Sequence, residues 1–474
     1  MNYMRHVPIE ADHFSLEQHF AEVSSLLGHR GPLFRDTDIH WLEMADYDSR
    51  LSQHLNALCA AGETAIELAR AAVWRFDPGD RRAGVWLLTQ TREGCDRLSE
   101  LLSDWDRLSA MAGDDRVDEL ERSWFEGLKL GRPDFLAPIL WLMVRFGNLG
   151  TRRWVAEVIG YQRLPMSDLL AELLDDPFAL VAGEAALSLG KLGDTAFRPR
   201  LEALLRELHR RDERDACDLV ATGLKLIGSV LPSLHARGCL QVASSLSPVQ
   251  AELLAMEGRY DDLDRLCELC RRPEIGPEMW AVLGVLGYPD AVPYLLNVME
   301  ALPQAVEPAR EALWLLTGAS PAAGASGEMS ESSGSSVVSL DTEDLEDDWV
   351  ESLDEIVDLD DMEESPASSG EPAQAPAPAP HEPVVWWREW WRANGHRFEE
   401  GSRYRLGRPF SVEAVVAEIQ HPNSSFAHRR RALIEVSRFV GMEPGLIFEP
   451  DEPVSRQQER LAQLKLPEAP LPTT

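Results

Sequence analysis

Tryptophan and arginine gather in one short stretch of this sequence, and together they could bind an anionic ligand, a nucleic acid or a partner protein. Residues 386–391 read WWREWW, and Arg397, Arg403, Arg405 and Arg408 follow. Indole rings offer stacking surfaces, and guanidinium groups pair with carboxylates and phosphates. The four tryptophans also share one face of a helical wheel about 140° wide, as in a helix that buries that face. We therefore expect a core helix here, packed on the preceding helix that carries ALWLLTG, in preference to an exposed aromatic platform.

Cys267 and Cys270 have the C-x-x-C spacing of redox and zinc sites. A structural zinc ion needs four ligands, and the sequence contains no second C-x-x-C pair and no H-E-x-x-H motif. The pair lies in DDLDRLCELCRRP, where helical periodicity places both thiols on an apolar face. Phosphate-binding loops, G-x-S-x-G elbows and dinucleotide-binding glycine motifs are also missing. The sequence therefore predicts no catalytic residue, no cofactor and no metal site.

The negative charge is concentrated in one segment. The 474 residues have a net charge of −34, and residues 321–383 contribute 18 acidic and no basic residues. Residues 1–320 are also acidic, with 33 basic against 50 acidic residues, while residues 384–474 are nearly neutral. A nucleic-acid-binding protein would show a basic surface, so we expect no nucleic acid among the partners. No apolar run has the length of a membrane span, no signal peptide is evident, and the six cysteines are scattered. We therefore expect a cytoplasmic protein without membrane insertion.

An amphipathic segment lies inside the acidic region. Residues 341–364 carry 14 acidic side chains and no basic one. Their apolar residues fall on one helical face, as in a disordered segment that folds into the groove of a partner. Two other interpretations remain open: an acidic loop that only aids solubility, and docking onto the chain's own arginine-rich C-terminal region. The candidate partner-binding residues of this segment are Leu345, Trp349, Val350, Leu353, Ile356 and Val357.

Arg429, Arg430 and Arg431 form the most basic cluster of the chain, at the start of a predicted helix in AHRRRALIEVSRFVG. Arginines at such positions commonly pair with neighbouring helices, and this structural interpretation is favoured. The alternative is that the three cations receive an acidic partner. All three are therefore kept as candidate partner-binding residues.

Helices must position all of these residues, because helical periodicity dominates the chain outside residues 321–383. Leu, Ala, Glu and Arg prevail, and alternating strand patterns are scarce. Ser247-Pro248-Val249-Gln250 combines a capping serine, a proline in the first turn and a glutamine three residues after the cap, which predicts a helix start. We expect an all-α fold.

The pattern G-x-L-G occurs three times, at residues 147–150, 190–193 and 284–287. The first two copies begin 43 residues apart, and the last two begin 94 apart, which is two periods of 47. Gly193 fits a helix end in the left-handed conformation, and Asp194 can cap the next helix. The second and third copies are followed by a proline and a leucine at equal distances: Pro199 and Leu201, Pro293 and Leu295.

Residues 175–208 and 278–302 resemble HEAT repeats of the bacterial kind, with the pattern DPFALVAGEAALSLGKLGDTAFRPRLEALL. The whole chain also resembles a proteobacterial family of uncharacterised HEAT-repeat proteins, through HWLEMADYDSRLSQHLNALCAAGETAIELA (40–69), ALWLLTGA (312–319) and the WWREWW…RYRLGRP stretch. The resemblance implies an α-solenoid of stacked helix pairs that acts as a non-catalytic protein-binding scaffold or adaptor. Members of the family sometimes occur near type VI secretion genes, which implies an accessory role in that machinery.

The expected organisation has four parts. Residues 1–125 form an N-terminal helical region, 126–320 the HEAT-like array, 321–383 a disordered acidic and proline-rich insertion, and 384–474 a C-terminal helical region that continues or caps the array. Two alternatives to a scaffold stay open. An immunity or inhibitor protein could neutralise a basic effector with this acidic surface. HEAT-like repeats also occur in lyases and DNA glycosylases, although no catalytic constellation supports an enzyme here.

Overall fold

Helices make up almost all of the regular structure, which confirms the all-α prediction. The computed structural model describes residues 13–36, 39–102, 114–242, 246–272, 275–321, 382–437, 439 and 448–464. The chain divides into two compact units, one made of Met1–Ala319 with Asn394–Thr474 and the other of Ser320–Ala393. None of the described helices combines the length and the hydropathy that a membrane span requires.

The first unit begins with helices that pack around α4, which contacts α1, α3, α5 and α7. The predicted boundary between residues 125 and 126 falls inside α7. The bounds of these helices are α1 (His13–Arg35), α2 (Met44–Ala60), α3 (Glu63–Ala72), α4 (Pro78–Leu88), α5 (Arg92–Leu102) and α7 (Asp114–Lys129).

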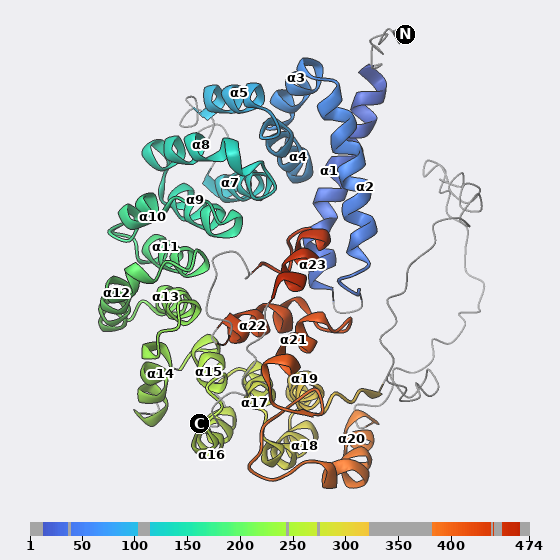
Figure 1. Ribbon diagram of the computed structural model, residues 1–474, viewed down its shortest axis with the longest axis vertical. Coiled ribbons are helices and arrows are strands. Elements are labelled where there is room, and N and C mark those ends of the chain that lie inside the picture. Colours follow the sequence, from blue (N-terminus) through green and yellow to red (C-terminus); the bar gives the residue numbers. More distant parts are fainter. Residues whose placement is uncertain are drawn as a thin grey trace, which may run out of the picture. The chain divides into compact units, whose positions relative to one another are not determined.

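Helices of the middle part follow one another in sequence order, with α9, α11, α13, α15, α17 and α19 each packed on the next (Figure 1). The even-numbered helices each pack on the odd-numbered helix that follows, in the pairs α8 with α9, α10 with α11, α12 with α13, α14 with α15, α16 with α17 and α18 with α19. The bounds are α8 (Pro133–Phe146), α9 (Leu149–Gln162), α10 (Ser167–Leu173), α11 (Ala179–Lys191), η1 (Thr195–Phe197), α12 (Arg198–Arg210), α13 (Arg214–Leu226), α14 (Leu231–Val242), α15 (Pro248–Ala255), η2 (Tyr260–Asp262), α16 (Leu263–Cys270), η3 (Pro277–Trp280), α17 (Ala281–Leu286), η4 (Pro289–Ala291), α18 (Val292–Ala301), η5 (Pro303–Ala305) and α19 (Val306–Thr317).

Two of the three G-x-L-G segments end a helix in the same way. Gly193 and Gly287 follow α11 and α17 in the left-handed conformation, with φ of 69° and 81°. The first glycine of each copy lies where two helices touch: a Cβ on Gly190 would come within 2.5 Å of Gly223, and one on Gly284 within 2.6 Å of Ala312. These glycines therefore let α11 approach α13, and α17 approach α19, to backbone contact.

The first copy, residues 147–150, has a different role. Gly147 follows α8 in an extended conformation, and the side chain of Asn148 accepts a hydrogen bond from the Thr151 amide and so caps α9. The copy therefore contains the junction between two helices.

The helix start predicted at Ser247 is confirmed. The Ser247 hydroxyl accepts a hydrogen bond from the Gln250 amide at 3.1 Å at the start of α15.

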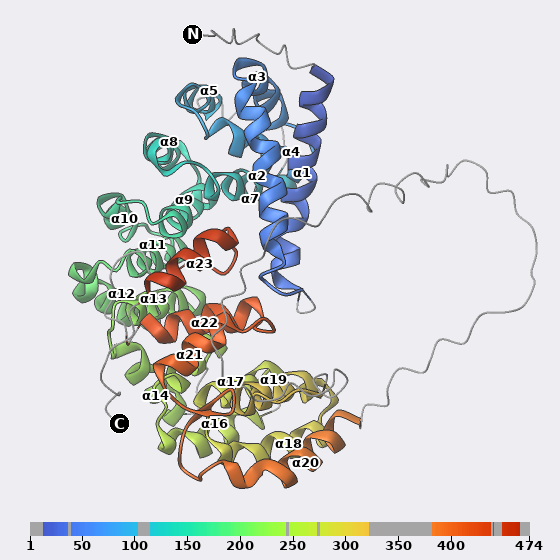
Figure 2. The same cartoon turned by 45° about the vertical axis from the view of Figure 1, so that its right-hand side comes forward.

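The C-terminal segment returns to helices that lie far apart in the sequence (Figure 2). Its helix α22 contacts both α1 and α13, α23 contacts α2, and strand β1 contacts α19. Backbone bonds tie the β1–β2 hairpin to the ends of α17 and α19, from Tyr404 N to Gly287 O at 2.8 Å and from Leu406 N to Leu315 O at 2.7 Å. The elements are η7 (Gly395–Arg397), β1 (Tyr404–Arg405), β2 (Arg408–Pro409), α21 (Val412–Gln420), α22 (Phe426–Ser437) and α23 (Val454–Gln463).

One hydrophobic core joins the N-terminal helices to this C-terminal segment. Trp41 and Met44 are buried in the same cluster as Ile419, Leu433 and Phe448. The segment therefore stabilises the first unit by joining its N-terminal helices to its middle part. It also brings polar side chains to the region where the candidate pocket lies.

Candidate anion-binding pocket

Only part of the predicted partner-binding set lies within the described residues. Arg429 and Arg431, on α22, are buried, and only Arg430 is exposed. The remaining predicted residues fall outside the described part of the chain, so their docking role stays a prediction: Leu345, Trp349, Val350, Leu353, Ile356 and Val357.

The two buried arginines of α22 are held by contacts inside the chain. The guanidinium of Arg429 stacks over Trp41 at 3.8 Å from the ring centroid and donates to Gln457 Oε1 at 2.6 Å. Arg431 donates to Glu418 Oε1 at 3.2 Å. These partners come from α21, α23 and the N-terminal region, so both side chains have the structural role that the sequence favoured.

Arg405, from the arginines that follow the tryptophans, is also an internal residue. It pairs with Glu418 at 2.9 Å and with Glu435 at 2.8 Å, and all three side chains are fully buried. Arg403 adds a longer contact to Glu435 at 3.5 Å. This network fixes the β1–β2 hairpin on α21 and α22 and leaves Arg405 unable to meet a ligand.

The four tryptophans lie on α20 (Glu382–Asn394), and all but the last residue of this helix belong to the second unit. Trp387 is 1% exposed, whereas Trp386, Trp390 and Trp391 are half-buried. The rings of Trp386 and Trp387 meet edge to face at 4.9 Å, and those of Trp387 and Trp390 at 6.0 Å. The cluster is thus a packed aromatic group of which one member is buried completely.

Cys267 and Cys270 lie on α16, and both are free and buried. Burial raises the pKa of the Cys267 thiol to about 12. Such a thiol is inert at neutral pH. The two side chains therefore belong to the apolar face that the helical pattern predicts.

A basic pocket of about 590 Å³ lies within the first unit, in a region that the sequence did not indicate. Its walls come from α1, α4, α7 and α9 and from Asp451 of the C-terminal segment. Three carboxylates line it, those of Glu126, Glu157 and Asp451. They face six cationic side chains, those of Arg30, Arg35, Arg82, Arg122, Lys129 and Arg153.

Arg30 is held rigidly at one wall of this pocket. Its Nε donates to Asp48 Oδ1 at 2.8 Å and its Nη1 to the Asp451 carbonyl at 2.7 Å, while the guanidinium lies over Phe34. The residue is 7% exposed, and its Nη2 is buried without a hydrogen-bond partner. Arg30 therefore contributes a fixed positive charge to the pocket lining.

The opposite wall combines charge with aromatic surface. Arg122 and Arg153 each lie within 6 Å of the Trp154 ring. Lys129 bridges Glu126 and Glu157 at 2.8 and 2.7 Å. Burial opposes ionisation of Glu157, but the attraction and the hydrogen bond of Lys129, together with Lys191 and Arg153, outweigh it and lower the pKa of this carboxyl. The excess positive charge therefore comes mainly from the arginines.

The charges continue inward from the pocket to α11. Burial, and then repulsion by Glu157, raise the pKa of Glu184 to about 7, although Lys191, Arg153 and Lys129 act in the opposite direction. Lys191 also pairs with Glu449 of the C-terminal segment at 2.7 Å. Charged side chains of alternating sign therefore connect α7, α9 and α11 with the C-terminal segment.

The pocket can bind an anionic group. Its volume lies within the range of about 300–1,000 Å³ typical of ligand sites, and guanidinium groups pair with carboxylates or phosphates in a fork geometry. Trp154 and Tyr161 add aromatic surface to the lining. The sequence alone did not reveal this site, because its arginines are spread over residues 30–153 and no local motif distinguishes them from other helix-surface arginines.

In comparisons with known proteins, no family model, no curated protein and no solved structure matches the chain.

Proposed function

We propose that this chain is a non-catalytic protein-binding scaffold or adaptor, and that its basic pocket receives a carboxylate-rich segment of the partner. In this proposal the middle helices form an α-solenoid of HEAT-like pairs. The resemblance noted in the sequence makes a component of the type VI secretion machinery the first partner to test.

The helix packing supports the solenoid. Each odd-numbered helix from α9 to α19 contacts the next one, and each even-numbered helix packs on the odd-numbered helix that follows it. Glycines bring α11 onto α13 and α17 onto α19 in the same manner. Such nearest-neighbour packing is typical of repeat arrays, which present long surfaces to protein ligands.

The pocket is the observation that carries the proposal. It places six cationic side chains against three carboxylates in a chain with a net charge of −34. The surrounding negative charge disfavours a long polyanion such as a nucleic acid. A short acidic segment can instead place a few carboxylates in the pocket and keep the rest of the partner away from the acidic surface.

Two other features bear on the alternatives. An inhibitor of a basic effector would use acidic surface, so a basic pocket favours the acidic-partner hypothesis over that one. All six cysteines are free thiols, which supports a reducing compartment such as the cytoplasm.

The test measures binding of a labelled hexaglutamate peptide by fluorescence anisotropy. Arg35 and Arg122 lie exposed at the rim of the pocket, so Arg35→Glu with Arg122→Glu reverses two charges without disturbing the core. We expect this double variant to bind the peptide at least tenfold more weakly, since each charge pair near a surface contributes about 1 kcal/mol or more. Binding by the wild type should also weaken as salt increases.

The matched control reverses two exposed arginines outside the pocket, Arg50 and Arg70. This variant has the same net charge as the pocket variant and should bind the peptide like the wild type. Equal loss in both variants would indicate a general charge effect, and no binding by the wild type would refute the acidic-ligand proposal. A cellular partner recovered by the wild type and the control, but not by the pocket variant, would identify the scaffold's client.

A further inference from the structure

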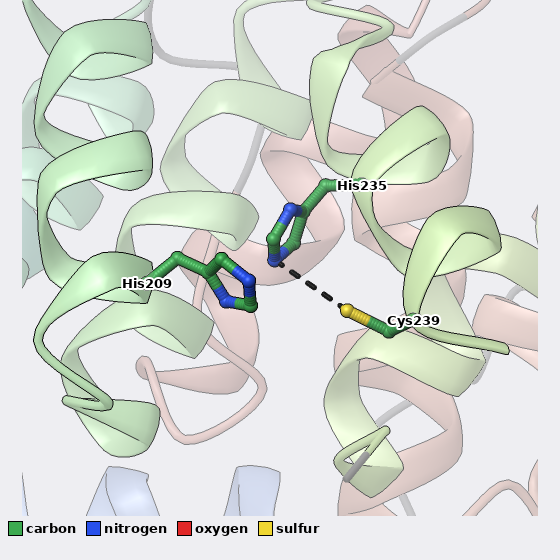
Figure 3. Close-up of side chains that lie close together, drawn as sticks. All are labelled: His209, His235 and Cys239. Carbon is green, nitrogen blue, oxygen red and sulfur yellow. Dashed lines mark hydrogen bonds between the residues drawn. The ribbon is translucent and has the colours of Figure 1, made fainter. Parts of the chain in front are cut away.

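Two histidines and a cysteine converge between α12 and α14 (Figure 3). His209 lies in the last turn of α12, while His235 and Cys239 are one turn apart on α14. One ligand atom from each side chain lies within 4.8 Å of the other two. The imidazole rings are 4.3 Å apart between centroids, and His235 Nε2 is 3.8 Å from Cys239 Sγ.

These separations are close to those of a tetrahedral zinc site. Zinc–nitrogen bonds of about 2.0–2.1 Å and zinc–sulfur bonds of about 2.3 Å place tetrahedral nitrogen and sulfur ligands about 3.5 Å apart. The observed 3.8 Å between the His235 nitrogen and the Cys239 sulfur needs only a small side-chain adjustment. Imidazole with thiolate is also a donor set that zinc prefers over hard cations such as magnesium or calcium.

The three side chains differ in their exposure to solvent. His209 is exposed, whereas His235 and Cys239 are half-buried. The cluster is thus open to solvent on the side of His209 and anchored on the side of α14.

We propose that His209, His235 and Cys239 bind one Zn²⁺ ion. The three side chains occupy three tetrahedral positions, and the fourth is open to water or to a ligand from a partner. Both α12 and α14 pack on α13, so the ion joins the two helices that flank it. This site is separate from the basic pocket, because it shares no residue with the pocket lining.

The experiment uses full-length protein treated with a chelator, which is then titrated with Zn²⁺ against a chromogenic competitor. We expect one Zn²⁺ per chain and at least about tenfold weaker binding after His209→Ala, His235→Ala or Cys239→Ser. Co²⁺ serves as a spectroscopic probe: the wild type should give a thiolate charge-transfer band and the absorption of tetrahedral cobalt. Cys239→Ser should lose the charge-transfer band, and circular dichroism checks that each variant is folded.

Two control variants separate this site from other thiols and histidines. Cys59→Ser removes another half-buried free cysteine, and His54→Ala removes one member of the His19–His54 pair, whose Nδ1 atoms are 2.9 Å apart. Both controls should bind Zn²⁺ like the wild type. The proposal is overturned if the wild type takes up no Zn²⁺, or if binding is lost in His54→Ala and retained in the three cluster variants.

Discussion

Gly190→Ala should destabilise the protein, because it inserts a methyl group where α11 touches α13. The Cβ of alanine would lie 2.5 Å from both the Cα and the carbonyl oxygen of Gly223. These are backbone atoms of a helix, so no flexible side chain can move aside. Ordinary contact begins at 3.4 Å, and the two helices must therefore separate along their closest approach.

The expected magnitude follows from two opposing effects. Added volume in a close-packed interior costs about 1–3 kcal/mol, while replacing a helical glycine by alanine gains up to about 1 kcal/mol. Because the clash is with backbone atoms, the cost should lie in the upper part of its range, and we expect a net loss of about 1–2 kcal/mol in the free energy of unfolding. Gly238→Ala is the matched control, since Gly238 lies in α14 with nothing within 4 Å of the added Cβ. It should gain about 0.5–1 kcal/mol.

Urea unfolding followed by far-ultraviolet circular dichroism measures both variants under the same conditions. Because both substitutions add one methyl group to a helix, the difference between them isolates the contact between α11 and α13. If Gly190→Ala were as stable as Gly238→Ala, the two helices could not be in backbone contact. The packing argument for this part of the chain would then fail.

Three further predictions concern buried charge and the acidic segment. Arg405→Met should destabilise the chain by about 3–5 kcal/mol, because it leaves Glu418 and Glu435 buried without their main partner. Adding Glu435→Gln should recover part of the lost stability, as measured by urea unfolding, and no recovery would contradict the pairing. The pKa of Glu184 is about 7 in the folded chain, against an ordinary 4.5, so the free energy of unfolding should fall as the pH rises between these values. The advantage of Glu184→Gln over the wild type should therefore grow from about pH 5 to about pH 7.5, and a constant difference would contradict this origin of the shift. Deletion of residues 341–364 should remove a partner from affinity purifications if this segment docks, and equal recovery by both chains would exclude that role.

Helix identity and two of the glycine positions could be predicted because they depend on neighbours in the sequence. Gly193 and Gly287 end helices that are followed by Pro199 and Pro293 in the first turn of the next helix. Residues 147–150 have the same G-x-L-G pattern, yet there Asn148 caps a new helix, α9, that begins inside the motif. The two glycines of the motif therefore do not by themselves show whether a helix ends there or a new helix begins.

The burial of the arginines depended on distant residues. The position of Arg429 at a helix start was visible in the sequence, but its partners Trp41 and Gln457 come from opposite ends of the chain. Arg405 likewise finds its carboxylates on α21 and α22. A charged residue can be assigned to a partner-binding surface or to an internal pair only after these contacts are known, because both roles use the same residue type.

The two candidate sites differ in how far the sequence could have revealed them. His235 and Cys239 are four residues apart on one helix, so a search for mixed histidine and cysteine ligands at helical spacing would have found two of the three zinc ligands; the third required the packing of α12 and α14 on α13. The basic pocket has no such local pattern. Its cations lie on four helices, and its lining includes Asp451 from the C-terminal segment, whose carbonyl holds Arg30. That segment also supplies the core around Trp41, so it both stabilises the N-terminal helices and holds Arg30 at the wall of the pocket.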